Sequence, residues 1–252
     1  MKNSKLILSV AVSAMLGIGA AYAADLPVKS LPMVAAPVFS WTGCYVGVHA
    51  GAGVLLDQGY QQGAIDRDRH GVGGLAGGQI GCNYQTGMLV VGIEGEGFWS
   101  GMKVTQDQFG GINGNTLFST GSIKNKWDYD VAGRFGIAFD RALIYGKAGW
   151  VFGGFDWNFA TVNGNNSNQG SATLDGLLIG LGLEYAFTNN LTAKFEYDYL
   201  GFNAKNVRFT EYCAFCNVTT STFTQNVSAD KHIFKLGLNY LFNAAAPVIA
   251  KY

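Results

Sequence analysis

Acidic and basic side chains recur at every second position in several segments of this 252-residue sequence. Alternate residues of a β-strand point to the same face, so these charges would share one side of a sheet. Carboxylates and cations gathered there can neutralise one another as ion pairs, or they can line a path for ions. The candidate residues are Glu94, Glu96, Asp128, Asp130, Arg134, Lys147, Glu184, Lys194, Glu196, Asp198 and Lys235.

The residues between these charges are mostly apolar or aromatic. In the segment GLGLEYAFTNNLTAKFEYDYL, residues 180–200, most odd positions are large and apolar, and most even positions are small or charged. This alternation predicts two antiparallel strands, and Thr-Asn-Asn at 188–190 predicts a tight turn between them. If Phe187 pairs with Leu191 across that turn, Glu184 lies opposite Lys194.

Eight segments show this alternation, and each is close to the ~9–11 residues that a tilted strand needs to cross a bilayer. Short connections alternate with long polar ones, which occupy residues 55–71, 101–126, 158–172 and 203–231. Long loops at one end and tight turns at the other are typical of outer-membrane barrels. The predicted strands are residues 44–54, 72–84, 89–99, 127–139, 142–155, 174–187, 191–202 and 232–242.

The two faces of these strands predict which side is the inside. The small and charged face fits the inside of a narrow tube, so the large apolar face would contact lipid. A soluble lipocalin-like barrel is the alternative, but its outer face would be largely glycine and alanine, and only 13% of the chain is charged. The predicted fold is all-β, an eight-stranded antiparallel up-and-down transmembrane β-barrel. Aromatic residues near the strand ends predict an interfacial girdle: Trp99, Trp127, Phe139, Phe187, Tyr199 and Phe242.

The ends of the chain differ from the body. Residues 1–23, MKNSKLILSVAVSAMLGIGAAYA, have a basic start, an apolar core and an Ala-Tyr-Ala cleavage motif, which predict a signal peptide. An N-terminal membrane helix is the alternative, but the apolar run is shorter than the ~20 residues that span a bilayer. Residues 24–40 hold three of the four prolines and predict a periplasmic linker outside the core. The barrel would occupy residues 41–242 and a tail residues 243–252 of an exported outer-membrane protein.

Two pairs of cysteines could cross-link in the oxidising periplasm. Cys44 and Cys82 fall on the outward face, and a hairpin centred near Gly63 would align them. The long loop between them leaves this register, and hence the disulfide, open. Cys213 and Cys216 form a CxxC in the last long loop, for which a loop staple is the favoured interpretation and a redox or half-zinc site the alternative.

The interior of an eight-stranded tube is just wide enough for side chains. This favours a structural salt-bridge plug for the charged residues, with an ion path or gate as the alternative. The net charge of zero argues against nucleic-acid binding. His49, His70 and His232 are scattered without catalytic or metal-ligand spacing, so no catalytic residue, metal or cofactor is predicted.

Four segments carry a resemblance to a known family. They are WTGCYVGVHAGAG at 41–53, GGQIGCNYQ at 77–85, GIEGEG at 92–97 and GLEYAFTNNLTAKFEYDYL at 182–200. With them the chain resembles the small outer-membrane β-barrel proteins of alphaproteobacteria, the porin-family or OmpA-like barrel domains known as surface antigens. The resemblance implies an eight-stranded barrel that serves envelope integrity and surface interaction, and it brings no catalytic residues.

Three functions follow as hypotheses. The first is a structural and surface-interaction barrel of the cell envelope, and the second is a narrow porin-like channel for ions or small solutes. The third, a lipid-modifying outer-membrane enzyme, would need a Ser/His/acid set at one rim. The expected partners are outer-membrane lipids, lipopolysaccharide and the barrel-insertion machinery, which would read a terminal aromatic at Phe242 or Tyr252. The segment 66–70, DRDRH, is expected to be solvated, with contact to lipopolysaccharide phosphates as the alternative.

Overall fold

Alternating side chains place every described strand in one antiparallel sheet. The computed structural model describes residues 39–57, 70–110, 116–161, 166–213 and 216–242. The predicted signal peptide, the tail and most of the linker lie outside these residues and remain predictions. The strands are β1 Gly43–Asp57, β2 His70–Thr86, β3 Leu89–Ser100, β4 Lys103–Gly110, β5 Thr116–Phe139, β6 Ala142–Thr161, β7 Asn166–Ala186, β8 Leu191–Cys213 and β9 Val218–Phe242.

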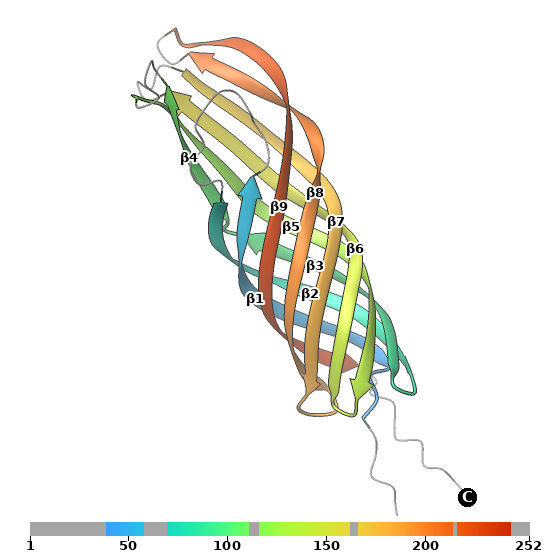
Figure 1. Cartoon of the computed structure of the whole chain (residues 1–252). Coiled ribbons are helices and arrows are strands. Elements are labelled where there is room, and N and C mark those ends of the chain that lie inside the picture. Colours follow the sequence, from blue (N-terminus) through green and yellow to red (C-terminus); the bar gives the residue numbers. More distant parts are fainter. Residues whose placement is uncertain (1–38, 58–69, 111–115, 162–165, 214–215, 243–252) are drawn as a thin grey trace, which may run out of the picture. The chain divides into compact units, whose positions relative to one another are not determined.

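The sheet closes on itself (Figure 1). β1 pairs with both β2 and β9, and the other edge is removed because β3 pairs with β5. β3 and β4 behave as one interrupted strand: β3 covers the lower part of β5, and β4 resumes along its upper part after Gly101 and Met102. Because β3 and β4 together occupy one strand position, the ring has eight positions. This confirms the predicted eight-stranded antiparallel barrel. Closure leaves no unpaired strand edge within hydrocarbon, where such an edge is not tolerated.

The register predicted at the β7–β8 turn is confirmed. The Phe187 N–H donates to the Leu191 carbonyl at 3.0 Å, and Glu184 lies opposite Lys194. Glycine is required at position 182, because a Cβ built there would lie 2.3 Å from the ring of Tyr145. The small residues on the inner face thus leave room for large side chains that cross the lumen.

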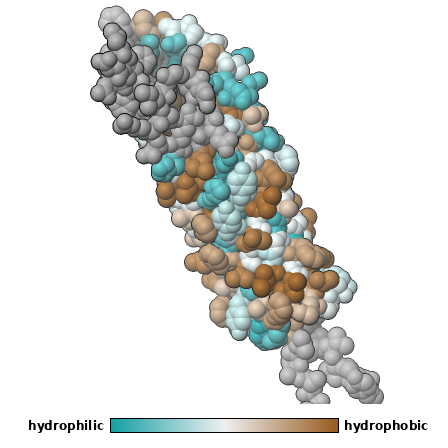
Figure 2. Space-filling view, in the orientation of Figure 1, coloured by the Kyte–Doolittle hydropathy of each residue, from teal (hydrophilic) through white to brown (hydrophobic). Residues whose placement is uncertain are grey.

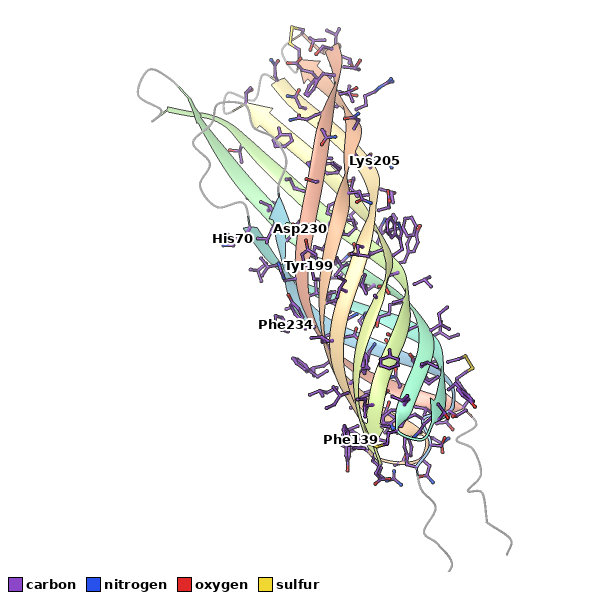
Figure 3. The ribbon with its side chains drawn as sticks, turned by 45° about the vertical axis from the view of Figure 1, so that its right-hand side comes forward. His70, Phe139, Tyr199, Lys205, Asp230 and Phe234 are labelled. Atoms are coloured by element: carbon purple, nitrogen blue, oxygen red, sulfur yellow. A yellow bond between two sulfur atoms is a disulfide. The ribbon has the colours of Figure 1, made fainter. Side chains whose placement is uncertain are left out.

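The outer face is apolar in the part of the ring nearer the short turns. Leu181 and Leu236 are each 67% exposed, and Phe139 and Phe234 point away from the ring (Figure 3). Hydrophobic residues gather mainly over this part of the visible face (Figure 2). Such a surface is the lipid-facing band of an outer-membrane barrel. The described residues include no helix of the length and apolarity that a membrane crossing requires.

Most of the residues predicted as long loops are strand instead. β5, β8 and β9 have 24, 23 and 25 residues, about twice the ~9–11 that cross a bilayer. The segments predicted as loops at 101–126, 158–172 and 203–231 are largely the upper halves of β4 to β9. They look like loops in the sequence because their outer face is Asn-, Ser- and Thr-rich. That composition suits strands that have left hydrocarbon and meet water.

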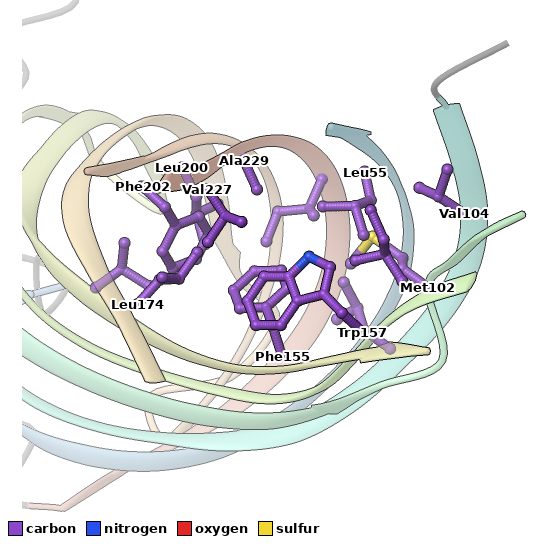
Figure 4. Close-up of a cluster of buried hydrophobic side chains, with 14 of the residues drawn as sticks. Leu55, Met102, Val104, Phe155, Trp157, Leu174, Leu200, Phe202, Val227 and Ala229 are labelled. Atoms are coloured by element: carbon purple, nitrogen blue, oxygen red, sulfur yellow. The ribbon is translucent and has the colours of Figure 1, made fainter. Parts of the chain in front are cut away.

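The inner face of these upper halves is apolar, the reverse of the lipid-facing part. Phe155, Trp157 and Phe209 point inward and are at most 3% exposed, and Trp157 lies among other apolar side chains inside the ring (Figure 4). We call this group the upper apolar cluster. It comprises Leu55, Leu75, Phe98, Met102, Val104, Ile123, Ala132, Val151, Phe155, Trp157, Leu174, Leu178, Leu200, Phe202, Val207, Phe209, Val227, Ala229 and Ile233.

A second apolar group, the lower apolar cluster, lies at the short-turn end. Trp41 is fully buried, packs edge-on against Phe39 with ring centroids 5.0 Å apart, and donates its indole N–H to the Asp140 carbonyl at 3.2 Å. Phe39, predicted to belong to a linker outside the core, is therefore part of it, because its ring covers the end of the lumen. The cluster comprises Phe39, Trp41, Tyr45, Val90, Ala138, Leu143, Tyr145, Ala186 and Leu241.

Both cysteine pairs form disulfides in the structure. Cys44 and Cys82 are opposite each other on the exposed face of β1 and β2, in the alignment that a hairpin centred near Gly63 gives. Cys213 and Cys216 bridge the ends of β8 and the following turn. The first bond closes a segment with a sequence separation of 38, and the second a separation of 3.

We expect the two disulfides to differ in their contribution to stability. Replacing Cys44 and Cys82 by serine should lower the free energy of unfolding by about 2–4 kcal/mol, since a long closed segment restricts the unfolded chain most. The matched variant Cys213→Ser/Cys216→Ser should lose only about 1–2 kcal/mol. Urea unfolding of the refolded barrel measures both, and equal losses would contradict this assignment.

Candidate functional site

All eleven predicted charged side chains lie inside the ring. Each belongs to a strand whose alternate residues face lipid, and none of the eleven is more than 4% exposed. They come from β3, β5, β6, β7, β8 and β9, so the network crosses the lumen instead of following one hairpin. We call them, with the polar side chains that they contact, the ionic layer.

The centre of the ionic layer is a group of ammonium and carboxylate groups. Lys194 contacts Glu96 at 2.6 Å, and Lys147 contacts Glu96 at 3.0 Å and Glu196 at 2.8 Å. Lys235 pairs with the same two acids, at 2.8 Å to Glu196, and also reaches Asp198 at 2.6 Å. Each lysine therefore meets at least two carboxylates, which compensates the high cost of burying a charge.

Arg134 forms a second centre nearer the short turns. Its guanidinium donates to Glu184 at 2.7 Å and to Glu94 at 3.4 Å, and it also donates to the hydroxyl of Tyr45. Tyr45 in turn donates to Glu94 at 2.7 Å. The guanidinium lies 3.9 Å from the ring centroid of Tyr145, a cation–π contact. The arginine is thus held by two acids and two aromatic rings.

One basic residue of the ionic layer was missed by the sequence analysis. Lys231 is fully buried and pairs with Asp128, and its ammonium lies 4.9 Å and 4.8 Å from the rings of Phe155 and Phe202. It was assigned to a loop at 203–231. Its position four residues before Lys235 places it on the same face of β9, and extending the alternation backwards would have found it.

Uncharged polar residues complete the layer, and they too were not predicted. His49 contacts Gln79 at 2.6 Å, Gln79 donates to Asn239 at 2.7 Å, and Asn239 donates to Glu184 at 2.7 Å. Thr192 donates to the same Glu184 oxygen as Asn239, at 2.5 Å. This chain links β1, β2 and β9 to the acid that holds Arg134.

Asp130 is the predicted site residue that the network does not bind directly. It is 2% exposed and lies opposite Glu96 in the β3–β5 register. Neither of its carboxylate oxygens has a hydrogen-bond partner among the described residues. The structure thus brings together ten of the eleven predicted residues and leaves Asp130 at the edge of the group.

The acids also have the spacing of a metal site. Oxygen atoms of Glu94, Glu96 and Glu196 lie within 4.8 Å of one another. The ammonium groups of Lys147 and Lys194 contact all three of these acids. The two lysines therefore supply the positive charge that a bound cation would supply, and they neutralise the three carboxylates.

A closed antiparallel ring with an apolar outer band is the architecture of an outer-membrane barrel. The family model of the outer membrane protein beta-barrel domain matches residues 11–242. This chain belongs to that family. Its place is the outer membrane, as the sequence predicted.

Relatives with assigned names agree with this membership. The chain is 31% identical over 224 residues to a 22 kDa outer membrane protein of Rhizobium leguminosarum bv. viciae, covering 87% of this chain and 83% of that protein. It is 32% identical over 262 residues to a 31 kDa outer-membrane immunogenic protein of Brucella melitensis biotype 1, covering 94% of this chain and all of that protein (100%). The resemblance to alphaproteobacterial outer-membrane barrels is confirmed.

Among solved structures, the outer membrane protease OmpT from Escherichia coli is similar with a TM-score of 0.53. The two share 9% sequence identity, and the match covers 83% of this chain and 100% of that one. At this identity the likeness shows a shared fold alone.

We expect the buried ion pairs to matter far more for stability than the exposed one. Arg134→Ala leaves Glu184 without its cation in the lumen, while Glu94 keeps Lys147 and Lys194. The variant should lower the free energy of unfolding by about 3–5 kcal/mol. Lys126→Ala removes a pair with Asp156 whose side chains are 57% and 36% exposed, and should change it by less than about 1 kcal/mol.

Urea unfolding in the same lipid or detergent compares the two variants directly. Heat-dependent gel mobility shows beforehand that each variant has formed the barrel. Similar losses for Arg134→Ala and Lys126→Ala would contradict a structural role of the ionic layer.

Proposed function

We propose that this chain is a structural and surface-interaction barrel whose lumen is closed and which performs no catalysis. The observation that carries the proposal is the filling of the lumen. The ionic layer lies between the upper and the lower apolar cluster, so three successive layers of side chains occupy the inside of the ring. An interior just wide enough for side chains is expected for eight strands.

The ionic layer and the two apolar clusters argue against the channel alternative. A conducting path needs sites that an ion can enter and leave. The ammonium groups of Lys147, Lys194 and Lys235 are instead each held by two or more carboxylates. Trp41 below and Trp157 above the layer are at most 3% exposed, and such apolar side chains would have to move before water could pass.

The surface role rests on the upper halves of β4 to β9. They extend beyond the lipid-facing band and present polar side chains outward, among them the exposed Thr173, Arg208 and Thr222. A rigid sheet positions such residues more precisely than a flexible loop would. The extension is therefore the part of the chain best suited to contact other molecules at the cell surface.

Two of the three histidines, His49 and His232, support the proposed absence of catalysis. His49 is buried beside Gln79, and His232 contacts the Tyr197 hydroxyl at 2.7 Å. Within the described residues neither belongs to a Ser/His/acid arrangement at a rim, which a lipid-modifying enzyme would need. The relatives with assigned names are called outer membrane or outer-membrane immunogenic proteins, and the protease named above shares only the fold.

The partners that this function implies are lipids, lipopolysaccharide and the insertion machinery. The lipid-facing band would contact acyl chains. Phe242 is 46% exposed as the last residue of β9 and lies opposite Cys44 of β1. It has the position of the terminal aromatic that the machinery reads, while the tail at 243–252 lies outside the described residues.

We expect the refolded protein to be silent in a planar bilayer. The lumen layers leave no continuous water-filled path, so single-channel recording should show no steady openings for the native chain. Arg134→Ala should also be silent, because both apolar clusters remain. Steady ohmic openings whose conductance changes in Arg134→Ala would favour the channel and contradict this proposal.

The surface role predicts which end of the barrel is outside the cell. In a Thr222→Cys variant, a membrane-impermeant maleimide should label the new thiol on intact cells. The matched variant Asn189→Cys, at the β7–β8 turn, should be labelled only after the outer membrane is permeabilised. Labelling of Asn189→Cys on intact cells would show the opposite orientation.

A further inference from the structure

We propose that a basic row on the outer face of β4 to β8 binds phosphate groups of the outer-leaflet glycolipid, lipopolysaccharide. The row consists of Lys103, Lys124, Lys126 and Arg208, with Asp156 as its acid. The three lysines lie just beyond the lipid-facing band, and Arg208 lies farther out. The proposal rests on the surface-interaction role proposed above and assigns residues to it, and it would hold whether or not the lumen conducts.

The first observation is a pair of like charges. Lys103 on β4 and Lys124 on β5 lie directly opposite each other in the register, and both are exposed. Like charges at such positions destabilise a sheet. Neither ammonium group has a hydrogen bond or ion pair among the residues that the structure describes. An anion between the two ammonium groups would turn this repulsion into attraction.

The second observation is the continuation of the row across the sheet. Lys124 lies opposite Asp156 on β6, and Asp156 lies opposite Ser171 on β7. A groove of roughly 530 Å³ runs over these strands, with Lys126 at one end and Arg208 at the other. Lys126 pairs with Asp156, so the acid is compensated and Arg208 gives the groove lining a net positive charge.

The third observation is the height of the row. Trp99 and Trp127 lie opposite each other, 63% and 40% exposed, where aromatic residues mark a membrane interface. Lys124 lies three residues before Trp127 on β5, about 7–8 Å in height for a strand tilted by about 40°. The headgroup region extends about 5–8 Å beyond the hydrocarbon. The lysines are therefore level with lipid phosphates.

An aromatic stack adjoins the basic row. Trp127 stacks on Tyr129 at 5.6 Å between ring centroids, and Tyr129 stacks on Phe152 at 4.9 Å. Trp127 also lines a second groove together with Lys126 and Asp156. A flat apolar ring beside cations suits a phosphorylated sugar better than an acyl chain or a free ion. Arg208, nine residues beyond Tyr199 on β8, and Lys205, on the outside of the extension (Figure 3), lie farther out, where the sugar chain would continue.

Energy transfer from tryptophan to labelled lipopolysaccharide tests the proposal. The full chain is refolded into phosphatidylcholine vesicles that contain intact or dephosphorylated lipopolysaccharide. The test variant is Lys103→Gln/Lys124→Gln/Arg208→Gln. The control, Lys103→Arg/Lys124→Arg/Arg208→Lys, keeps every charge, and heat-dependent gel mobility shows that both variants fold.

The native chain and the control should bind intact lipopolysaccharide with equal affinity. The glutamine variant should bind it about 10- to 100-fold more weakly, since each basic residue near an anionic surface adds a binding free energy of the order of RT. Higher salt should weaken the binding of intact lipopolysaccharide by the native chain and leave the binding by the glutamine variant nearly unchanged. Dephosphorylated lipopolysaccharide should bind weakly and equally to all three proteins.

Three outcomes would overturn the proposal. One is equal affinity of the glutamine variant and the native chain. Another is equal affinity of the native chain for intact and dephosphorylated lipopolysaccharide. The third is displacement of the labelled glycolipid by millimolar inorganic phosphate, which would show a site for the free anion in place of a lipid headgroup.

Discussion

Each long strand of this barrel passes from hydrocarbon into water, and this change of surroundings fixes which of its faces is apolar. In hydrocarbon the outer face must be apolar, whereas in water the apolar residues gain by packing inside. On β8, Phe195 faces out while Val207 and Phe209 face in. A register shift between Phe202 and Lys205 separates the two parts. Since an extra residue changes which alternate positions face inward, a bulge lets one strand satisfy both solvents.

The same constraint places the charges. Polar side chains in the lower half can only face the lumen, and there they are buried, so a charged one needs a partner from another strand. Lys235 of β9 reaches Glu96 of β3 across a sequence separation of 139, and Arg134 of β5 reaches Glu184 of β7. These contacts tie together strands that are not neighbours in the ring. The ionic layer thereby contributes to fixing the register of the whole sheet, and apolar clusters cover it at both ends.

The lower half was predictable because one rule holds along it. Period-two alternation gave the strands, their faces and the Glu184–Lys194 register, and the charged lumen followed. The upper half was not, because its outer face is polar and its inner face apolar, the reverse of the lower half, and a polar outer face resembles a loop. Lys231 was missed because the predicted strand at 232–242 began one residue after it. Phe39 was missed because its burial depends on the barrel mouth that it covers, and proline-rich surroundings indicate only a linker. Local patterns do not contain such long-range contacts.

The lumen and the outer surface therefore have different roles. Inside, nearly every polar group is committed to holding the strands in register, so a change there alters stability before it alters any interaction. On the outer face beyond Trp99 and Trp127, the fold requires only polar side chains, and serine or threonine would be sufficient. Two lysines placed directly opposite each other, Lys103 and Lys124, cost stability at positions where neutral residues would not. Such a cost at an otherwise permissive surface is the one that the proposed anionic ligand would offset.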